Sequence, residues 1–559
     1  MGRKDKPSDQ LHVGAKLRHA RQSQAITLSQ MAERLSYSKG YLSAVENGHR
    51  RPSPDVVTGY RDALGPRLFE QLGRDESFVA ARIERAAPIV PEHRGAWGHG
   101  ATMGDRAPAA LGPDKSDTQL HGRLTPTARR HYSSLILRHL VYYDGLTKAK
   151  LSQLTGLSPT VVGGILRREL ADLIIEADPA QSGARPSSFV CLNKDAFSIL
   201  SIDLGRLRTR LALTNLRAEP IPLRSKDLPS MPISPREGWS GSYDPELEAG
   251  LVSVATPTDK FAAREEILAW LYWAVAQTLQ AYRMQGMPPL LAVGIGAPGP
   301  GPVDGTLWKP ANMPGFHNIP IRDPLARYLE VPVIVENDAD ALAMIWHLLL
   351  LPDQPYMAVL TATQGIGSGI IFGGELLRAP NGLVGEVGLG SLGVAGHGQE
   401  ARIVSNLESK ATTTATIKRY NAMTGEHRRL QGRDDACIRE LCRRAREDGD
   451  GSAQEAIYET ACWLATAVVS VCYAYNSRVV VVDSPMLAAP DAFFLNPIKK
   501  AVKMMVDLPV EVRSNDLRRG LSPLSGGACL VLDKLLGGGW DDGGGLLDTL
   551  LSITRIRGG

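Results

Sequence analysis

Val331-Pro-Val-Ile-Val-Glu-Asn-Asp-Ala-Asp340 is the stretch around which the rest of the chain can be interpreted. Its β-branched and apolar residues end abruptly at Glu336-Asn337-Asp338, and an apolar run with helical spacing follows at 341–351. Open α/β sheets present polar groups to a ligand in this way, at the carboxyl end of a buried strand. Acids at strand ends also serve structure alone, so a binding role and a structural role both stay open here.

A glycine-rich segment and a second acid follow further along the chain. Residues 358–372 predict a strand, a turn and a second strand. Gly365, Gly367 and Gly369 make the predicted turn between these strands rich in glycine. Glu386 lies beyond them in another turn flanked by glycines. The order and spacing of these groups along the chain are stronger evidence for a functional site than any one of the groups alone.

Strands and helices alternate through this half of the chain. Residues 198–213 and 290–301 each predict a strand that ends in a tight turn, and 478–482 predicts a last strand after a helix over 461–475. Such units interleaved with helices predict an α/β domain with a cleft between two halves.

The composition indicates a soluble protein of several domains. A length of 559 residues exceeds what one hydrophobic core supports, so three or more domains are expected. The net charge of +4 leaves any affinity for nucleic acid to local basic patches. We find neither an apolar signal region at the start nor an apolar run of about 18 residues, so we expect a cytoplasmic protein with no membrane partner.

The cysteines indicate a reduced protein. None of them makes a CxxC pair, and four lie inside apolar runs, so we expect them to be reduced and buried. They are Cys191, Cys437, Cys442, Cys462, Cys472 and Cys529.

Residues 11–65 predict four short helices in quick succession. Thr27 and Gln30 fit a capping box at the start of the second helix, and Leu42 and Val45 point inward from the third. A helix pair with a polar outer face fits a major groove, whereas a small helical bundle with a solvated basic surface is the alternative. The segment resembles the Cro and phage-repressor type of helix-turn-helix domain. That resemblance makes Lys39, the best candidate for a guanine contact, one of the expected DNA-binding residues, with Tyr41, Ser43, Arg50 and Arg51.

Residues 127–176 predict a second module of three helices. Ser158-Pro159 opens the third helix, and 173–175 and 189–192 predict the two strands of a wing. This pattern fits a winged helix-turn-helix, with an oligomerisation module as the alternative. The arginine of an Arg-Pro wing tip can enter a narrow minor groove. The expected DNA-binding residues are Thr160, Arg167, Arg168 and Arg185, with Gly163 and Gly164 on the same exposed side.

From residue 127 to residue 536 the order of motifs resembles the ROK family, which groups sugar kinases and sugar-responsive repressors on the actin-like ATPase fold. The resemblance implies that hexose hydroxyls are bound by Asn312, Asn337, Asp338, Glu386 and Glu408. In ROK kinases the counterpart of Asp338 is the catalytic base. The resemblance also implies that Gly365, Gly367 and Gly369 form the second phosphate loop, where glycine lets the backbone approach an anion closely.

The departures from the kinase pattern argue against catalysis. ROK kinases show Asp-x-Gly-Gly-Thr at the first phosphate loop, where this chain has Asp203-Leu-Gly-Arg-Leu207, and the adenosine-contacting glycines are replaced by Asp483-Ser-Pro485. Leu389 stands where the zinc-binding histidine would be, and 396–408 contains no cysteine. We therefore expect no structural zinc, no ATP and no catalytic residue, with Asp338 a vestigial base.

The expected domain plan follows from these segments. It comprises a helix-turn-helix domain (1–80), a flexible linker (81–125), a winged helix-turn-helix domain (126–195), a ROK-type domain (196–540) with a loop insertion at 219–258, and a tail (541–559).

The predicted function is transcriptional regulation, as a repressor, in response to a sugar or sugar phosphate. The expected partners are double-stranded DNA, that effector and further copies of the chain in a homodimer or higher homo-oligomer. Two alternatives stay open: an ATP-dependent sugar kinase with regulatory DNA-binding domains, and a DNA-binding protein whose ROK domain only dimerises.

Overall fold

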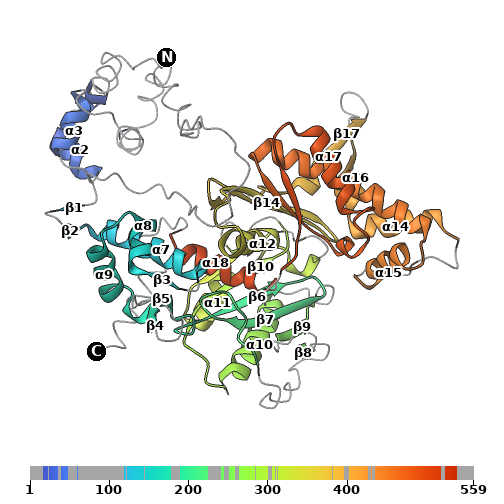
Figure 1. Ribbon diagram of the computed structural model, residues 1–559, viewed down its shortest axis with the longest axis horizontal. Coiled ribbons are helices and arrows are strands. Elements are labelled where there is room, and N and C mark those ends of the chain that lie inside the picture. The colour runs from blue at the N-terminus through green and yellow to red at the C-terminus, as the bar shows by residue number, and fades with distance from the viewer. Residues whose placement is uncertain are drawn as a thin grey trace. The chain divides into compact units, whose positions relative to one another are not determined.

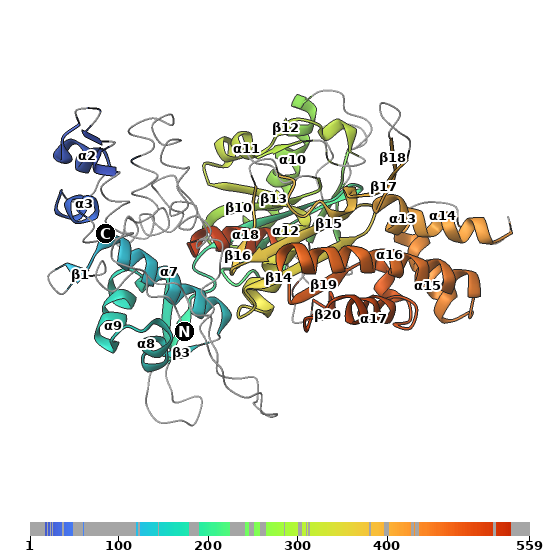
Figure 2. The ribbon, with the colours of Figure 1, turned by 90° about the horizontal axis from the view of Figure 1, so that it is seen from above.

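A computed structural model of the chain divides into two compact units, Met1–Gly104 and Asp105–Gly559. Figure 1 and Figure 2 show its elements from two directions. The structure describes residues 17–19, 21–22, 24, 26–35, 39–47, 60, 119–120, 123–143, 145–177, 189–223, 241–244, 251–257, 264–283, 285–299, 305–308, 310, 313–379, 382–395, 402–425, 430, 435–517, 521 and 523–537.

In the first unit, two short helices, α2 (Leu28–Arg34) and α3 (Lys39–Glu46), pack against each other. The predicted capping box is confirmed at the start of α2. The Thr27 N–H donates to Gln30 Oε1 at 2.9 Å, and the Gln30 N–H donates to Thr27 Oγ1 at 3.2 Å.

A buried ion pair holds the interior of this unit. Arg21 donates from Nε and Nη2 to the two carboxylate oxygens of Glu46, each at 2.6 Å, and the Tyr60 hydroxyl donates to Glu46 Oε1 at 2.7 Å. The hydrogen bond to Glu46 raises the pKa of Arg21. Leu42 and Val45 are fully buried beside the pair, as predicted. The interior of this unit therefore combines three hydrogen-bonded polar side chains with buried apolar ones.

The second unit begins with a two-stranded hairpin and a helical module. Thr125, Thr147 and Ser158 each cap a helix by accepting a backbone N–H, so the predicted helix start at Ser158-Pro159 is confirmed. The two strands predicted for a wing also form, and they pair antiparallel. The elements are β1 (Gln119–Leu120), β2 (Arg123–Leu124), α7 (Pro126–Tyr142), β3 (Leu146–Thr147), α8 (Lys148–Thr155), α9 (Pro159–Arg168), β4 (Ile174–Ala177) and β5 (Phe189–Leu192). Strands β3, β5 and β4 form a three-stranded sheet in that order.

Two mixed sheets form the body of this unit. The first has the order β13-β10-β6-β7-β9-β8, with β13, β10 and β6 parallel and the remaining pairs antiparallel. Helix α10 (Arg264–Arg283) packs on it, with Trp270 fully buried. The strands are β6 (Ser198–Leu204), β7 (Arg208–Thr214), β8 (Gly241–Asp244), β9 (Leu251–Ala255), β10 (Leu290–Ala297) and β13 (Val333–Asn337), and β11 (Thr306–Leu307), β12 (Ile319–Pro320) and α11 (Arg322–Leu329) lie between β10 and β13 in the chain.

The second sheet has the order β16-β15-β14-β19-β20, with β14, β19 and β20 parallel. Helices from the last third of the chain pack on it. The strands are β14 (Tyr356–Ala362), β15 (Ile366–Phe372), β16 (Glu375–Leu376), β19 (Val479–Asp483) and β20 (Glu511–Ser514); the helices are α13 (Glu408–Ala411), α14 (Thr413–Met423), α15 (Asp435–Arg446), α16 (Gly451–Tyr475) and α17 (Leu495–Met505), and β17 (Ser391–Ala395) pairs with β18 (Arg402–Asn406).

Two helices lie between the sheets, α12 (Asp338–Ile345) and α18 (Ser525–Leu535) (Figure 2). Helix α12 contacts β10 of the first sheet and both β14 and β15 of the second. Glycine permits this approach: a Cβ on Gly369 of β15 would lie 2.3 Å from the carbonyl oxygen of Ala339. The last turn of α12 continues as a π-helical turn, η5 (Trp346–Leu350). Helix α12 is therefore tightly held by both halves of the domain.

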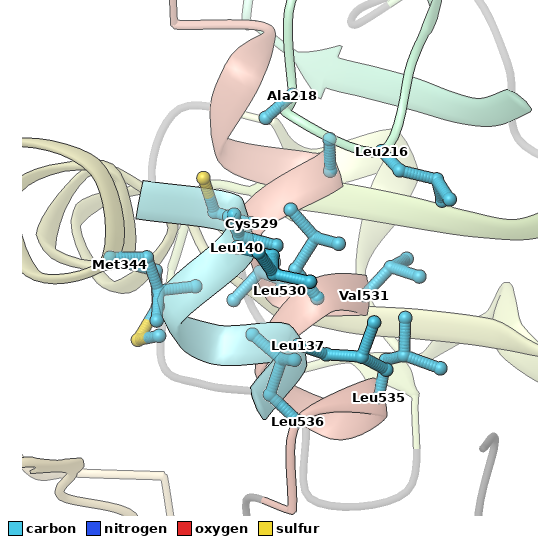
Figure 3. Close-up of a cluster of buried hydrophobic side chains, with 14 of the residues drawn as sticks. Leu137, Leu140, Leu216, Ala218, Met344, Cys529, Leu530, Val531, Leu535 and Leu536 are labelled. Atoms are coloured by element: carbon cyan, nitrogen blue, oxygen red, sulfur yellow. The ribbon is translucent and has the colours of Figure 1, made fainter. Parts of the chain in front are cut away.

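The helical module shares its hydrophobic core with the two-sheet body (Figure 3). Leu137 of α7 lies beside Leu535 and Leu536 at the end of α18, and Leu140 lies beside Leu530 earlier in the same helix. Arg217, in the turn after β7, donates to the carbonyl oxygens of Leu140 at 3.3 Å and Tyr143 at 2.5 Å. Because apolar and polar contacts both join them, the module and the body form one packed structure.

Three expectations about local structure are corrected. The segment 219–258 is not only a loop, because β8 and β9 form a hairpin that extends the first sheet; its Pro, Ser and Gly content hid the short apolar strand Leu251–Ala255. Gly163 and Gly164 are buried rather than exposed, with the guanidinium groups of Arg167 and Arg168 close to them. All six cysteines are free as expected, but Cys462 is exposed and Cys191 and Cys437 are only half-buried.

Helix α16 is apolar because it is a core helix. It is the one helix in the described ranges that is long and apolar enough to cross a membrane, with a mean hydropathy of 1.3, and 61% of that window is buried inside the protein. It begins ten residues earlier than the predicted 461, at Gly451, where Asp450 caps it.

Candidate functional site

Asn337 fixes the junction between β13 and α12. Its Oδ1 accepts the N–H of Ala339 at 2.8 Å, which makes it the N-cap of α12, and its Nδ2 donates to the carbonyl oxygen of Gly299 in the turn after β10. The predicted strand end is thus confirmed, whereas the helix begins at Asp338, three residues before the predicted run at 341–351. Both groups of the Asn337 amide are engaged within the protein, which limits what it can offer to a sugar hydroxyl.

Asp338 stands at the first position of α12 and is exposed to solvent. Its Oδ1 accepts the N–H of Ala339 at 2.8 Å. Crowding by protein atoms removes part of its hydration, and the carboxylates of Asp203 and Asp483 repel its charge, so its pKa is raised to about 7. A carboxyl group of this pKa can both accept and release a proton near neutral pH.

Glu386 and Glu408 complete a cluster of acids with Asp338. The pKa of Glu386 is raised to about 7 by partial burial, and then by the charges of Glu408 and Asp338. Glu408 Oε1 accepts the N–H of Ile366 at 3.0 Å and faces Gly365, where a Cβ would lie 3.0 Å from it. Three acids that are far apart in the sequence therefore lie in one neighbourhood. Such a cluster can exchange hydrogen bonds with several adjacent hydroxyls.

Glu386→Gln is expected to stabilise the protein at pH 8 by about 1–2 kcal/mol, with the gain shrinking toward zero as the pH falls to about 4.5. Between about pH 4.5 and pH 7 the folded protein holds a proton on Glu386 that the unfolded chain releases. The unfolding free energy of the wild type therefore falls as pH rises through this window. Thermal unfolding across the pH range measures this, with Glu375→Gln, at an exposed site on β16, as the control. A gain that does not change with pH would mean that packing, not ionisation, is responsible.

A second layer of ion pairs ties the end of β13 to α18. Arg378 donates to Glu336 Oε1 at 2.6 Å and lies 3.2 Å from Asp533 Oδ2. Burial raises the pKa of Asp340, and Glu336 adds to the shift. These contacts fix the end of β13, which directly precedes Asp338.

A cavity of about 500 Å³ adjoins the acid cluster. Its walls come from both halves of the domain, since Arg206 follows β6 of the first sheet and Gln364 lies between β14 and β15 of the second. Its lining is completed by Asn406, Glu408, Ser409, Thr412, Thr414, Ala415 and Lys418. Glu408 thus belongs to both the cavity and the acid cluster.

Comparison with known proteins identifies the two parts of the chain. Residues 255–526 match the ROK family, and residues 12–65 match a helix-turn-helix domain. The chain carries a ROK family domain. A crystal structure of a ROK family transcriptional regulator, a homologue of the Escherichia coli Mlc protein, aligns with a TM-score of 0.57 at 20% identity, over 77% of this chain and 99% of that one. The two-sheet body therefore has the α/β ROK, or actin-like ATPase, fold.

Sequence relatives of the ROK domain fall into two functional groups. A glucokinase of Halalkalibacterium halodurans is 27% identical over 220 residues, covering 38% of this chain and 66% of the relative. A protein of Caldicellulosiruptor sp. named for xylose repression is 25% identical over 267 residues, covering 45% and 57%. The chain thus spans about two thirds or less of the length of these curated relatives.

The predicted phosphate loop of the ROK domain is shorter than expected. Gly367 and Gly369 lie inside strand β15, and Gly365 stays in the turn before it. Gly369 is buried against α12, so the need for close packing explains it without a ligand. At the predicted adenosine site, Asp483 accepts a hydrogen bond from Asn515 Nδ2 at 2.8 Å, and Ser484 caps a short helix.

Reasoning from the sequence did not identify several polar residues that line the cavity. Arg206 was noted only as a lost glycine, and Lys418, Gln364 and Thr414 carried no motif. Their position became visible only when the fold brought α14 opposite the turn after β6. Asn312 lies outside the described residues.

The predicted DNA-binding residues lie on helices where the structure describes them. Lys39, Tyr41 and Ser43 belong to α3, and Ser43 is half-buried, accepting a hydrogen bond from Asn47 at 3.2 Å. Thr160, Arg167 and Arg168 are exposed on α9. The remaining three, Arg50, Arg51 and Arg185, lie outside the described residues.

The described part of the ROK domain holds no group of three or more His, Cys, Asp or Glu side chains arranged to bind a metal. Leu389, at the position of the family's zinc-binding histidine, is 50% exposed. The expectation of no zinc stays a prediction, because residues 396–401 lie outside the description.

Proposed function

We propose that the protein is a DNA-binding transcriptional regulator, acting as a repressor, whose ROK domain senses a sugar or sugar derivative. The observation that carries the proposal is the presence, in one chain, of a helix-turn-helix domain and a ROK domain. The shared fold with a ROK transcriptional regulator supports the same conclusion.

The module of α7, α8 and α9 supports a second DNA contact as a winged helix-turn-helix. Its three helices and three-stranded sheet are the elements of such a domain, and α9 exposes Thr160 with two arginines. Arginine side chains on an exposed helix can contact phosphates and bases in a major groove. The two modules would contact DNA in a homodimer or higher homo-oligomer, which predicts a palindromic or two-part site.

Helix α12 supplies a physical route from the sugar site to this module. Its first residue is Asp338, and its π-helical extension reaches α7, where His347 Nε2 lies 3.3 Å from Arg138 Nη2. At a rise of about 1.5 Å per residue this element is roughly 20 Å long. Burial and the charge of Arg138 lower the pKa of His347 to about 4, so its ring is neutral at pH 7. A ligand that shifts α12 would therefore shift α7.

Asp338→Ala is expected to abolish the effect of a sugar on DNA binding while leaving binding without sugar intact. Genomic fragments that the wild type selects in moderate salt supply the DNA, and a sugar panel supplies the ligand. Asp323→Ala, which removes an exposed acid from α11, is the control and should respond like the wild type. Loss of DNA binding by Asp338→Ala without sugar would show that the residue is structural. Weak, salt-sensitive binding without sequence preference would remove the regulator proposal.

A second candidate function, an ATP-dependent sugar kinase, is favoured by Asp338, whose raised pKa suits a general base. Phosphorylation of a hexose that Asp338→Asn abolishes would establish it. Arg206, in place of a phosphate-loop glycine, argues against it, because a bulky cation fills the space that a close backbone approach needs.

A further inference from the structure

The cavity between the two halves of the ROK domain is lined by polar side chains that lack partners within the described residues. Arg206 Nε is buried and has no hydrogen-bond partner, and Gln364, Thr414 and Lys418 make no hydrogen bond or ion pair there. A buried guanidinium nitrogen without a partner is costly, because desolvation is not compensated. Arg206 Nε is the buried donor among them, and together with the half-buried Gln364 and Thr414 and the exposed Lys418 it indicates a ligand that accepts hydrogen bonds.

The charges around the cavity favour an anion. Arg206 and Lys418 contribute two positive charges, and Thr412, Thr414 and Ala415 place the positive end of α14 at its wall. The opposing charge is that of Glu408, one oxygen of which accepts the backbone N–H of Ile366. The cations therefore outnumber the acid, and the helix end adds to them.

We propose that this cavity binds a phosphate group of the effector, with Arg206 and Lys418 as its charge partners and Thr414 and Gln364 as further donors. An arginine fork and an ammonium group match the geometry and charge of phosphate oxygens. The inference rests on the proposed function, in that the bound anion belongs to the ligand that the ROK domain senses. Arg206, which departs from the kinase loop, is then a binding residue for the phosphate of the effector.

The position of the cavity relative to the acid cluster indicates what else the ligand carries. Glu408 lines the cavity and also belongs to the acid cluster, whereas Asp338 and Glu386 belong to the acid cluster and do not line the cavity. Neutral hydroxyls suit the acids, and an anion suits Arg206 and Lys418. A phosphorylated sugar has both features, with a neutral ring at one end and a phosphate at the other.

Isothermal titration calorimetry on the full-length chain tests the proposal with four probes: inorganic phosphate, glucose, glucose 6-phosphate and ADP. Glucose 6-phosphate is expected to bind more tightly than glucose, and inorganic phosphate to compete with it. Arg206→Gln and Lys418→Gln should each weaken binding of phosphate-bearing probes about tenfold or more. Tight binding of ADP instead would identify a nucleotide as the source of the phosphate at the same site.

Lys500→Gln, at an exposed position on α17, removes the same charge away from the cavity and should bind like the wild type. Thermal unfolding without ligand verifies that each variant is folded. Absence of saturable binding of any phosphate-bearing probe to the wild type, or binding that Arg206→Gln and Lys418→Gln leave unchanged, would overturn the proposal. If phosphate binds at this site but never alters DNA binding, the anion site stands and the proposed regulatory function fails. Failure of the anion site and failure of the proposed function can therefore be told apart.

Discussion

Replacing Gly294 with alanine is expected to lower the unfolding free energy of the ROK domain by about 3 kcal/mol or more. A Cβ at Gly294 would lie 1.8 Å from the carbonyl oxygen of Gly527 and 2.4 Å from its carbonyl carbon. The obstacle is backbone, so no side-chain rotation relieves it. Strand β10 is hydrogen-bonded to β13 on one side and β6 on the other, which prevents the strand from retreating. The melting temperature should fall by roughly 6–12 °C, at about 2–4 °C per kcal/mol.

Gly451→Ala is the matched control, because nothing lies within 4 Å of the Cβ it would add. Gly451 is the first residue of α16, where alanine has the higher helix propensity, so a small gain in stability is expected. Wild-type stability in Gly294→Ala would show that α18 does not approach β10 this closely in solution. The closeness matters for function, because the end of α18 carries the leucines against which α7 packs.

The sequence around Asp338 predicted its local structure correctly because the signals there are local. A run of β-branched residues predicts β13, and the apolar run that follows it predicts α12. Neither signal depends on distant parts of the chain. The capping box at Thr27 and the helix start at Ser158 were predictable for the same reason.

The site itself required the fold. Glu408 raises the pKa of Glu386 only because the segment after β16 and the start of α13 meet in space. Gly369 looked like part of a phosphate loop, yet its neighbour is a helix that lies 30 residues earlier in the chain. Arg206 illustrates the limit best. In the sequence it is only a residue that replaces a glycine of the kinase loop. The structure shows that it lines a cavity together with residues of α14.

Glu46→Ala is expected to unfold the helix-turn-helix domain and abolish its DNA binding, while the ROK domain stays folded. The substitution leaves the Arg21 guanidinium buried, with an exposed side-chain fraction of 8%, and removes its counter-charge. Breaking a buried ion pair from one side costs about 3–5 kcal/mol, which is comparable to the whole stability of a domain this small. Hydrogen exchange of the α3 amides measures the local unfolding, and exchange in β10 of the second unit is the internal control.

The variant Arg21→Met, Glu46→Leu, Tyr60→Phe separates the charge effect from the packing effect. It replaces the whole polar group with apolar side chains, so no buried charge is left unpaired, and protection of α3 should return close to the wild-type value. Restored protection together with restored DNA binding would show that the ion pair serves folding of the domain. Protection that stays lost would mean that the bidentate geometry of Arg21 and Glu46, at 2.6 Å on each side, is itself required to position α3.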